Sequence, residues 1–317
     1  RPPTRIAVIG GGFTGAAFAV HLLRGVTEPV TIEIFEPRAA LGRGVAYGTL
    51  RPEHRINVPS DKMWIFDEAK TDFTAWLKRT GRFDADPQAI CDDGYHYSQR
   101  RDFGDYVAEV LAEARSSAHP ASAVTHHQTR AIDVVRVPGG GFVVTRGDGA
   151  QVATDRVVIT ASHGTPSVPW TEADEPPSSR AVIRDPWARE AFAHLDHHKH
   201  LLVIGTGLTM ADVVVSLNEQ GHHRQITAIS RRGLVPRRQG DFDEAYDFLA
   251  DEPVPQSARG MLALVRQRVR EVQKDGHSWH RVIDSVRCWL PSIWSEIPLY
   301  ERRRIIRWLR IYWDIHR

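Results

Sequence analysis

Residues 5–15, RIAVIGGGFTG, join an apolar strand pattern to a glycine-rich turn and decide the fold of the chain. Gly10 allows a tight turn, Gly12 lets a pyrophosphate approach the backbone, and Gly15 lets the next helix lie close to the strand. A helical pattern at 16–23 and a β-branched strand at 30–35 complete a βαβ unit. Because a helix N-terminus attracts anions, this unit is expected to bind a dinucleotide through Gly10, Gly12, Phe13, Thr14 and Gly15.

An acidic residue stands where the ribose of such a dinucleotide is expected. Glu36 ends the second strand, 21 positions after Gly15, and a carboxylate at that place accepts hydrogen bonds from ribose hydroxyls. The loop that follows contains Arg38 and the sequence LGRG at residues 41–44. Arg43 is expected to meet the pyrophosphate or, alternatively, to belong to a solvated basic loop, and both interpretations stay open.

A second glycine fingerprint occupies residues 201–210, LLVIGTGLTM, and again follows an apolar strand. A helix is expected at 208–219 and a second strand at 225–230. Met210 stands where the third glycine would be, which implies a looser contact between helix and strand. The predicted contacts with a second dinucleotide are Gly205, Gly207, Leu208 and Thr209.

The acidic residue of the first unit has no counterpart in the second. The strand at 225–230 is followed by Arg231 and Arg232, and arginines accommodate the 2′-phosphate that distinguishes NADPH from NADH. We therefore expect NADPH at the second fingerprint, with the alternative that both arginines line a solvated turn. Two dinucleotides in one chain usually serve hydride transfer from a nicotinamide to a flavin, so the expected cofactors are FAD and NADPH.

The remaining patterns predict an α/β fold with two Rossmann-like units, a small antiparallel insertion and a helical C-terminal extension. We expect an FAD-binding domain at 1–165, an inter-domain crossing segment at 166–197, and an NAD(P)-binding unit with the helical extension at 198–317. The crossing segment is rich in Pro, Glu and Ser and lacks periodicity. Further helices are predicted at 71–80, 103–115, 257–274, 278–289 and 299–312, and further strands at 131–137, 141–146 and 156–160.

Composition excludes several classes of function. A net charge of +2 predicts no nucleic-acid surface, and no stretch is apolar for long enough to span a bilayer. The N-terminus lacks a signal-peptide pattern, so a cytoplasmic protein is expected. The two cysteines, Cys91 and Cys288, form no C-x-x-C, which disfavours a flavin disulfide reductase. The histidines at 126–127 and 194–200 are interpreted as solvated loops, and no metal site is predicted.

Six separated motifs resemble, in order, those of bacterial FAD/NAD(P)-binding proteins related to flavin-dependent monooxygenases. They lie at residues 10–15, 41–47, 54–59, 100–106, 205–212 and 230–233. The resemblance implies FAD on the first fingerprint and NAD(P)H on the second. It also implies that Asn57, Val58, Pro59 and Met63 lie beside the flavin ring and that Arg100 lies near the FAD.

The same resemblance carries an expectation about the end of the chain. Proteins of this family usually continue past a segment like residues 309–317 and return to close over the flavin. The expected closing FAD segment is absent here, so either the chain is a part of a longer one or its flavin pocket is incomplete.

The motifs favour an NADPH-dependent FAD oxidoreductase, most simply a monooxygenase that acts on a small polar or amine-bearing substrate. Two alternatives stay open: a flavin reductase that passes electrons to a partner protein, and a non-catalytic nucleotide-binding protein. No catalytic acid or base can be assigned; His54 and Asn57 are candidates only through their place in the resembling loop. The sequence predicts neither the substrate nor the oligomeric state.

Overall fold

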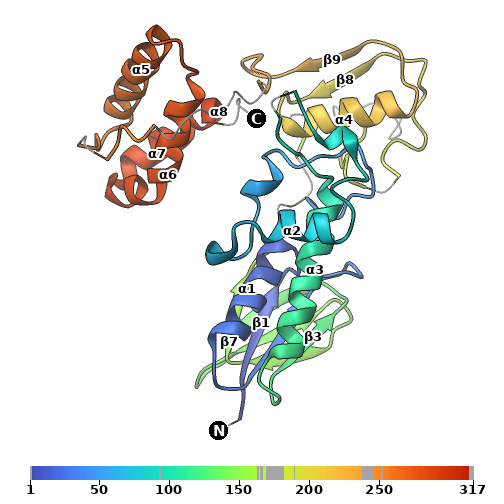
Figure 1. Cartoon of the computed structure of the whole chain (residues 1–317). Coiled ribbons are helices and arrows are strands. Elements are labelled where there is room, and N and C mark those ends of the chain that lie inside the picture. The colour runs from blue at the N-terminus through green and yellow to red at the C-terminus, as the bar shows by residue number, and fades with distance from the viewer. Residues whose placement is uncertain are drawn as a thin grey trace. The chain divides into compact units, whose positions relative to one another are not determined.

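A computed structural model describes residues 2–92, 94–162, 164, 167–168, 182–188, 190–237, 246–250 and 253–313. The chain divides into two compact units, Arg1–Asp196 and His197–Arg317, which Figure 1 shows with their helices and strands labelled. Part of the predicted crossing segment, residues 166, 169–181 and 189, lies outside the described residues. None of the helices in the described ranges combines the length and apolar composition needed to cross a membrane.

A parallel four-stranded sheet with the order β3-β2-β1-β7 forms the centre of the first unit. Its register pairs Ile6 with Ile32 and Val8 with Ile34 between β1 and β2, while β7 pairs with β1 and β3 with β2, again in parallel. Parallel pairing between β1 and β2 requires a crossover, which α1 supplies. The elements are β1 (Thr4–Ile9), α1 (Phe13–Gly25), β2 (Val30–Phe35), β3 (Ala123–His127) and β7 (Arg156–Ile159).

The two faces of this sheet are both covered, as side-chain alternation along the strands requires. Val8, Ile32 and Ile34 are fully buried on the helical face, where they join one core with residues of α1, α2 (Asp72–Arg79) and α3 (Arg100–Ser117). Ala7 and Phe35 point to the other face and pack with Val144 of the antiparallel insertion. The parallel sheet is therefore sandwiched between helices and a second sheet.

The antiparallel insertion was predicted, with strands at 131–137 and 141–146, whereas the predicted strand at 156–160 corresponds to β7 of the parallel sheet. The insertion contains β4 (Ala131–Arg136), β5 (Phe142–Arg146) and β6 (Gln151–Thr154), in the order β4-β5-β6. The turn at 139–141 consists of three glycines with positive φ angles, a conformation that other residues adopt only with strain. Neither β6 nor β3 was predicted, because both are short and half polar.

One interpretation of the sequence was wrong. His126 and His127 lie on β3 in the parallel sheet and not in a solvated loop. The Nε2 atom of His127 lies 2.7 Å from Oε2 of Glu33, and its ring stacks on Phe35 with centroids 4.7 Å apart. The polar ring is thus paired and stacked at the same time, which explains how two histidines are accommodated in a half-buried strand.

The second unit begins with the predicted strand, helix and strand: β8 (Leu201–Ile204), α4 (Leu208–Glu219) and β9 (Ile226–Ile229). β8 and β9 pair in parallel. Gly221, with φ +80°, follows the end of α4, and the N–H groups of Gly221 and His222 donate to the carbonyls of Asn218 and Leu217. This is the Schellman arrangement by which a left-handed glycine ends a helix.

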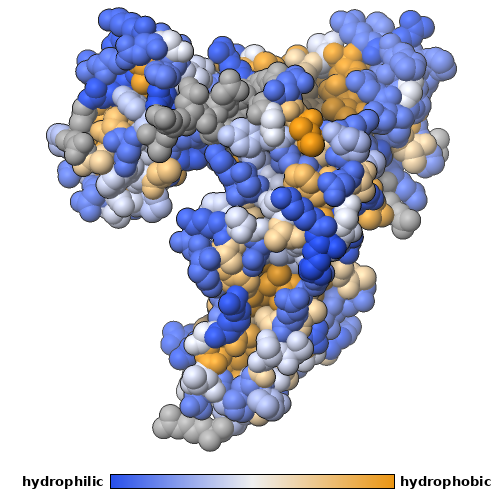
Figure 2. All heavy atoms as spheres, viewed as in Figure 1, coloured by the Kyte–Doolittle hydropathy of each residue, from blue (hydrophilic) through white to orange (hydrophobic). Residues whose placement is uncertain are grey.

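The C-terminal part of the second unit is helical, as predicted. Its helices are α5 (Ala258–Lys274), α6 (His280–Glu296), α7 (Leu299–Trp308) and α8 (Arg310–Trp313). α6 continues seven residues beyond the predicted end at 289 and contains Pro291. Their buried cluster includes Val282, Ile293 and Ile297. Hydrophobic side chains of β8 and β9 are exposed elsewhere in this unit, among them Leu202 (61%) and Ile204 (51%), in a region where Figure 2 shows orange surface.

Replacement of Ile32 by alanine should destabilise the first unit strongly. The side chain is fully buried between the sheet and its helices, so Ile32→Ala should lower the free energy of unfolding by about 2–5 kcal/mol. The matched control is Ile132→Ala, because Ile132 is also on a strand but 62% exposed. Urea unfolding followed by circular dichroism measures both, and equal destabilisation would contradict the assigned core.

Candidate dinucleotide-binding sites

The glycine turn of residues 10–15 lies at the carboxyl end of β1, and Gly10 and Gly15 have no room for a side chain. Gly10 has φ +106°, and a Cβ atom there would lie 2.6 Å from the carbonyl oxygen of Thr160. A Cβ atom on Gly15 would lie 2.1 Å from the carbonyl oxygen of Gly10. Both distances are far below contact, so only glycine permits α1 to begin this close to the turn and to β7.

The N-terminus of α1 is open to an anion. Gly12 is the N-cap residue, no side chain caps the helix, and no acidic residue lies in its first turn. The first-turn N–H groups, which include those of Phe13, Thr14 and Gly15, have no partner within a helix. Gly12 also lies against Gly44: a Cβ on Gly12 would be 3.3 Å from the Gly44 Cα. Two glycines thus keep side chains away from the positive end of the helix dipole.

Glu36 lies beside this turn, at the carboxyl end of β2. Its side chain is buried, with 4% of the residue exposed. Oε2 accepts a hydrogen bond from the Gly11 N–H at 3.1 Å, and Oε1 accepts from the Arg38 N–H at 3.0 Å and from Arg38 Nη1 at 3.2 Å. These donors fix the carboxylate next to the helix N-terminus, as the spacing from Gly15 led us to expect.

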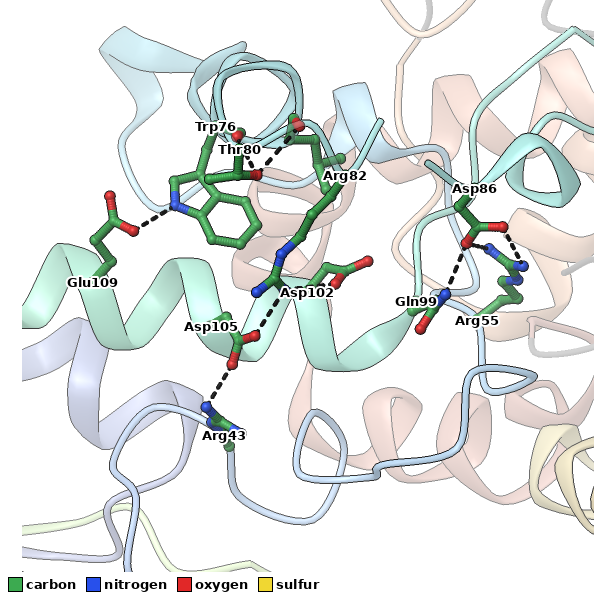
Figure 3. A network of polar contacts seen from close by, with 11 residues as sticks. Arg43, Arg55, Trp76, Thr80, Arg82, Asp86, Gln99, Asp102, Asp105 and Glu109 are labelled. Atoms are coloured by element: carbon green, nitrogen blue, oxygen red, sulfur yellow. Dashed lines mark hydrogen bonds and ion pairs between the residues drawn. The ribbon is translucent and has the colours of Figure 1, made fainter. Parts of the chain in front are cut away.

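Arg43 makes an ion pair inside the protein, with Asp105 of α3. Figure 3 shows that Asp105 also faces Arg82, whose Nη1 donates to Asp105 and Asp102 at 2.7 Å each. Gly104 makes this approach possible, because a Cβ there would lie 2.6 Å from the Tyr47 carbonyl oxygen and 3.0 Å from Arg43 Cγ. Arg43 therefore ties its loop to α3, and its contact with a pyrophosphate stays a prediction.

The loop that contains Asn57 is held in place by the segment at 96–100. The N–H groups of Ile56 and Ser60 donate to the carbonyls of Ser98 and His96 at 3.0 and 2.8 Å. Arg100 donates from Nε to the Arg55 carbonyl at 2.8 Å. Arg100 therefore positions the loop through the backbone, and Asn57 lies half-buried between two anchored neighbours. Direct contacts of Asn57 and Arg100 with a cofactor remain predictions.

Four residues that sequence reasoning missed support this loop. Arg55 makes hydrogen bonds through Nη1 and Nη2 to both carboxylate oxygens of Asp86, and Gln99 donates to Asp86 at 3.0 Å, as Figure 3 shows. Burial alone would raise the pKa of Asp86, but the hydrogen bonds from Arg55 and Gln99 outweigh it and lower that pKa. No sequence signal marks these residues, because Arg55 and Asp86 are 31 positions apart.

His96 is the fourth of these residues. Its Nδ1 lies 2.9 Å from the Ser60 hydroxyl, and its ring stacks on Phe83 with centroids 4.2 Å apart. Burial lowers the pKa of His96, and the carboxylate of Asp86 only partly offsets this effect. His96 is therefore a neutral ring that holds Ser60 through a side-chain contact and a backbone hydrogen bond.

The second fingerprint has the same backbone course but more space around it. Gly205 has φ +114°, and its N–H donates to the Ile229 carbonyl at 2.8 Å. Among the described residues, no heavy atom beyond the adjoining chain lies within 4 Å of a Cβ built on Gly205 or Gly207, in contrast to the first fingerprint. Gly207 is the N-cap of α4 without a side-chain cap, so Leu208 and Thr209 begin a second open helix N-terminus.

Side chains at the end of β9 complete this second site. Ser230 accepts a hydrogen bond from the Thr206 hydroxyl at 2.8 Å and from the Gly233 N–H at 3.0 Å. This fixes the turn in which Arg231 and Arg232 lie, both exposed. The structure thus brings each predicted set of residues together within its own unit.

Comparisons with known proteins agree with this geometry. The family described as FAD-NAD(P)-binding matches residues 7–164. A comparison with curated sequences found no match. Among solved structures, the ornithine N-hydroxylase of Kutzneria sp. 744, solved with reduced FAD, NADP+ and L-ornithine, is 16% identical with a TM-score of 0.52, over 87% of this chain and 70% of that protein.

Two other structures share parts of the fold. The bacillithiol disulfide reductase of Staphylococcus aureus is 16% identical with a TM-score of 0.48, over 84% of this chain and 65% of that protein. The cyclohexanone monooxygenase of Rhodococcus sp. Phi1, bound to NADP+, is 19% identical with a TM-score of 0.42, over 75% of this chain and 39% of that protein. The chain therefore spans less than two thirds of both of these proteins.

The first unit is a Rossmann-type dinucleotide-binding domain. The match of residues 7–164 to the model of the FAD-NAD(P)-binding family agrees with the resemblance that the sequence motifs indicated.

Acidification should weaken the first unit through His96. The folded chain keeps His96 neutral at a pH where the unfolded chain takes up a proton, since its folded pKa lies below the ordinary 6.5. The unfolded state then binds more protons, so stability falls as pH drops through about 6.5, by up to about 1.4 kcal/mol per pH unit. His96→Gln should lose this contribution.

The measurement is the unfolding free energy of the natural chain and of His96→Gln at pH 7.5, 6.5 and 5.5. We expect the stability of the natural chain to fall more steeply than that of the variant. Parallel pH dependence in the two proteins would show that His96 titrates alike in the folded and unfolded states.

Proposed function

We propose that this chain is an NADPH-dependent FAD oxidoreductase, and specifically a monooxygenase that acts on a small polar or amine-bearing substrate. The observation that carries the proposal is the turn of three glycines at 10–12, which places an uncapped helix N-terminus next to Glu36. The match of this domain to the FAD-NAD(P)-binding family supports FAD as its ligand. The amine-bearing substrate is suggested by the fold shared with an ornithine N-hydroxylase.

The residues of the first site fit an FAD. The N–H groups at the start of α1 would bind the pyrophosphate, because they have no partner within the helix and lie at the positive end of the helix dipole. The Glu36 carboxylate would accept hydrogen bonds from the adenosine ribose, and its bond to Gly11 keeps it oriented toward the turn. The anchored loop at 54–60 would present Asn57 to the flavin ring and exclude water from one side of it.

The second site fits a nicotinamide dinucleotide with a 2′-phosphate. The start of α4 would bind its pyrophosphate, and the exposed arginines after β9 would bind the phosphate with charge-assisted hydrogen bonds. The two cofactors would supply hydride transfer and reactivity toward O₂ when bound. The protein's own part is to bind, orient and shield; we assign no side chain as acid or base.

Gly12→Val should abolish FAD binding while the domain stays folded. The valine would occupy the space over the helix N-terminus and press on Gly44, which lies 3.3 Å from a Cβ at this position. Gly25→Val is the matched control, because Gly25 ends the same helix and its Cβ would meet nothing within 4 Å. FAD affinity is measured by flavin fluorescence titration. Equal affinity in the two variants would remove the turn from the FAD site.

Replacing Arg231 and Arg232 by alanine should erase a preference for NADPH over NADH. Each charge-assisted hydrogen bond to the 2′-phosphate contributes about 1.5–3 kcal/mol, so NADPH should bind at least about tenfold more weakly while NADH changes little. The control is the double variant Arg266→Ala and Arg270→Ala, which removes two exposed arginines of α5 in the same unit.

The readout is the rate at which NADPH or NADH bleaches the flavin absorbance without oxygen, with FAD added in excess. Equal rates for the two nucleotides in the natural chain would contradict the assigned role of the arginines. Return of the yellow colour in air, with oxygenated product from an amine substrate, supports the monooxygenase. Reoxidation only by a partner protein would identify a reductase. A complete lack of bleaching would identify a non-catalytic nucleotide-binding protein.

A further inference from the structure

A cavity of about 600 Å³ opens in the first unit between α2, α3 and the end of α1. Aromatic and aliphatic side chains form much of its wall, including Phe66, Trp76 and Val110. It is separate from the glycine turn, because Arg24 lines it near the C-terminal end of α1, eleven positions from Phe13. That interval is about 16 Å of helix axis. Figure 2 shows orange surface bordered by hydrophilic side chains on the first unit.

Two carboxylates that line this cavity form no ion pair with its arginines. Asp72, Glu109 and Glu113 line it together with two arginines, Arg24 and Arg79. Glu109 is used within the protein: it pairs with Arg79 and accepts a hydrogen bond from the Trp76 indole at 2.8 Å. In the part of the chain that the structure describes, the carboxylates of Asp72 and Glu113 make no ion pair or hydrogen bond, although the charge of Arg79 also acts on Glu113.

Arg24 does not neutralise them. Its Nη2 lies 3.8 Å from Oε1 of Glu68, and its guanidinium lies 3.8 Å from the centroid of the Phe66 ring. The Arg24 guanidinium is thus part of the wall of the cavity, beside Phe66. The remaining space is therefore bounded by apolar rings and by an excess of negative charge.

A buried hydroxyl at this cavity also lacks a partner. Tyr106 lines the cavity, is 2% exposed, and its Oη makes no hydrogen bond within the described residues. Burial raises the pKa of Tyr106, and Asp72 and Glu113 raise it further, which means that both carboxylates act on the same hydroxyl. An unsatisfied buried hydroxyl costs about 1–3 kcal/mol, and a ligand with N–H donors would satisfy it.

We propose that this cavity binds a small organic cation, namely a primary ammonium group on an aromatic or apolar body. The ammonium would pair with Asp72 and Glu113 and donate a hydrogen bond to the Tyr106 hydroxyl. The body would lie against the apolar wall that Phe66, Trp76 and Val110 form. A carboxylate ligand would be repelled by the two unpaired acids, and a neutral one would gain only the apolar contacts. This site is independent of the proposed redox function.

The test uses 2-phenylethylamine as the probe and 2-phenylethanol as its neutral counterpart, with binding measured by isothermal titration calorimetry on the full chain. We expect the amine to bind at one site per chain and the alcohol at least about tenfold more weakly. Asp72→Asn combined with Glu113→Gln should reduce the affinity for the amine by a similar factor. Glu28→Gln, which neutralises an exposed carboxylate outside the cavity, should have no effect.

Two further variants separate this site from structural effects and from the dinucleotide sites. Tyr106→Phe keeps the ring and should lower the affinity for the amine selectively. The enthalpy of unfolding of this variant, measured by calorimetry, should equal that of the natural chain. Gly12→Val should bind the amine as tightly as the natural chain does. Equal affinities for the amine and the alcohol, an unchanged affinity in the double variant, or no binding of the amine at millimolar concentration would overturn the proposal.

Discussion

The close approach of α1 to the turn after β1 is the contact on which the rest of the first unit depends. A methyl group on Gly15 would lie 2.1 Å from the Gly10 carbonyl oxygen, and one on Gly10 would lie 2.6 Å from the carbonyl oxygen of Thr160, which follows β7. Because no side chain separates these backbones, the helix N-terminus, the end of β2 and the end of β7 converge on one edge of the sheet. Such an edge is where α/β sheets bind their ligands.

A second layer of polar contacts turns this edge into a site of defined shape. The loop at 54–60 has no regular ladder of its own beyond a short helical turn, so its backbone groups must be satisfied by neighbours. The segment at 96–100 supplies them, and the pair between Arg55 and Asp86 fixes both from outside. Partly buried pairs of this kind add little net stability but are costly to break, because the remaining charge then lacks a partner. Their effect is to hold one loop conformation.

The sequence alone was sufficient to predict the features that depend on local patterns. The two glycine fingerprints, Glu36 and most helices and strands follow from turn chemistry and periodicity, which act over a few residues. The loop supports were not predictable, because His96 meets Ser60 across 36 positions and nothing local marks the pair. The loop prediction for His126 and His127 was wrong for a related reason. Their polarity indicated a loop, whereas contacts with Glu33 and Glu36 stabilise them within the sheet. Arg43 likewise has a partner on α3 that only the fold brings near.

The two fingerprints differ in a way that matters under the proposed function. At the first, backbone atoms of β7, Gly44 and the turn itself lie within 3.3 Å of where side chains would begin, and the acid beside it is 4% exposed. At the second, the corresponding positions are open and the basic residues are exposed. Under the proposed function, packing against neighbouring backbone therefore requires glycine in the flavin turn, whereas in the nicotinamide turn the left-handed φ angle of Gly205 is what requires it.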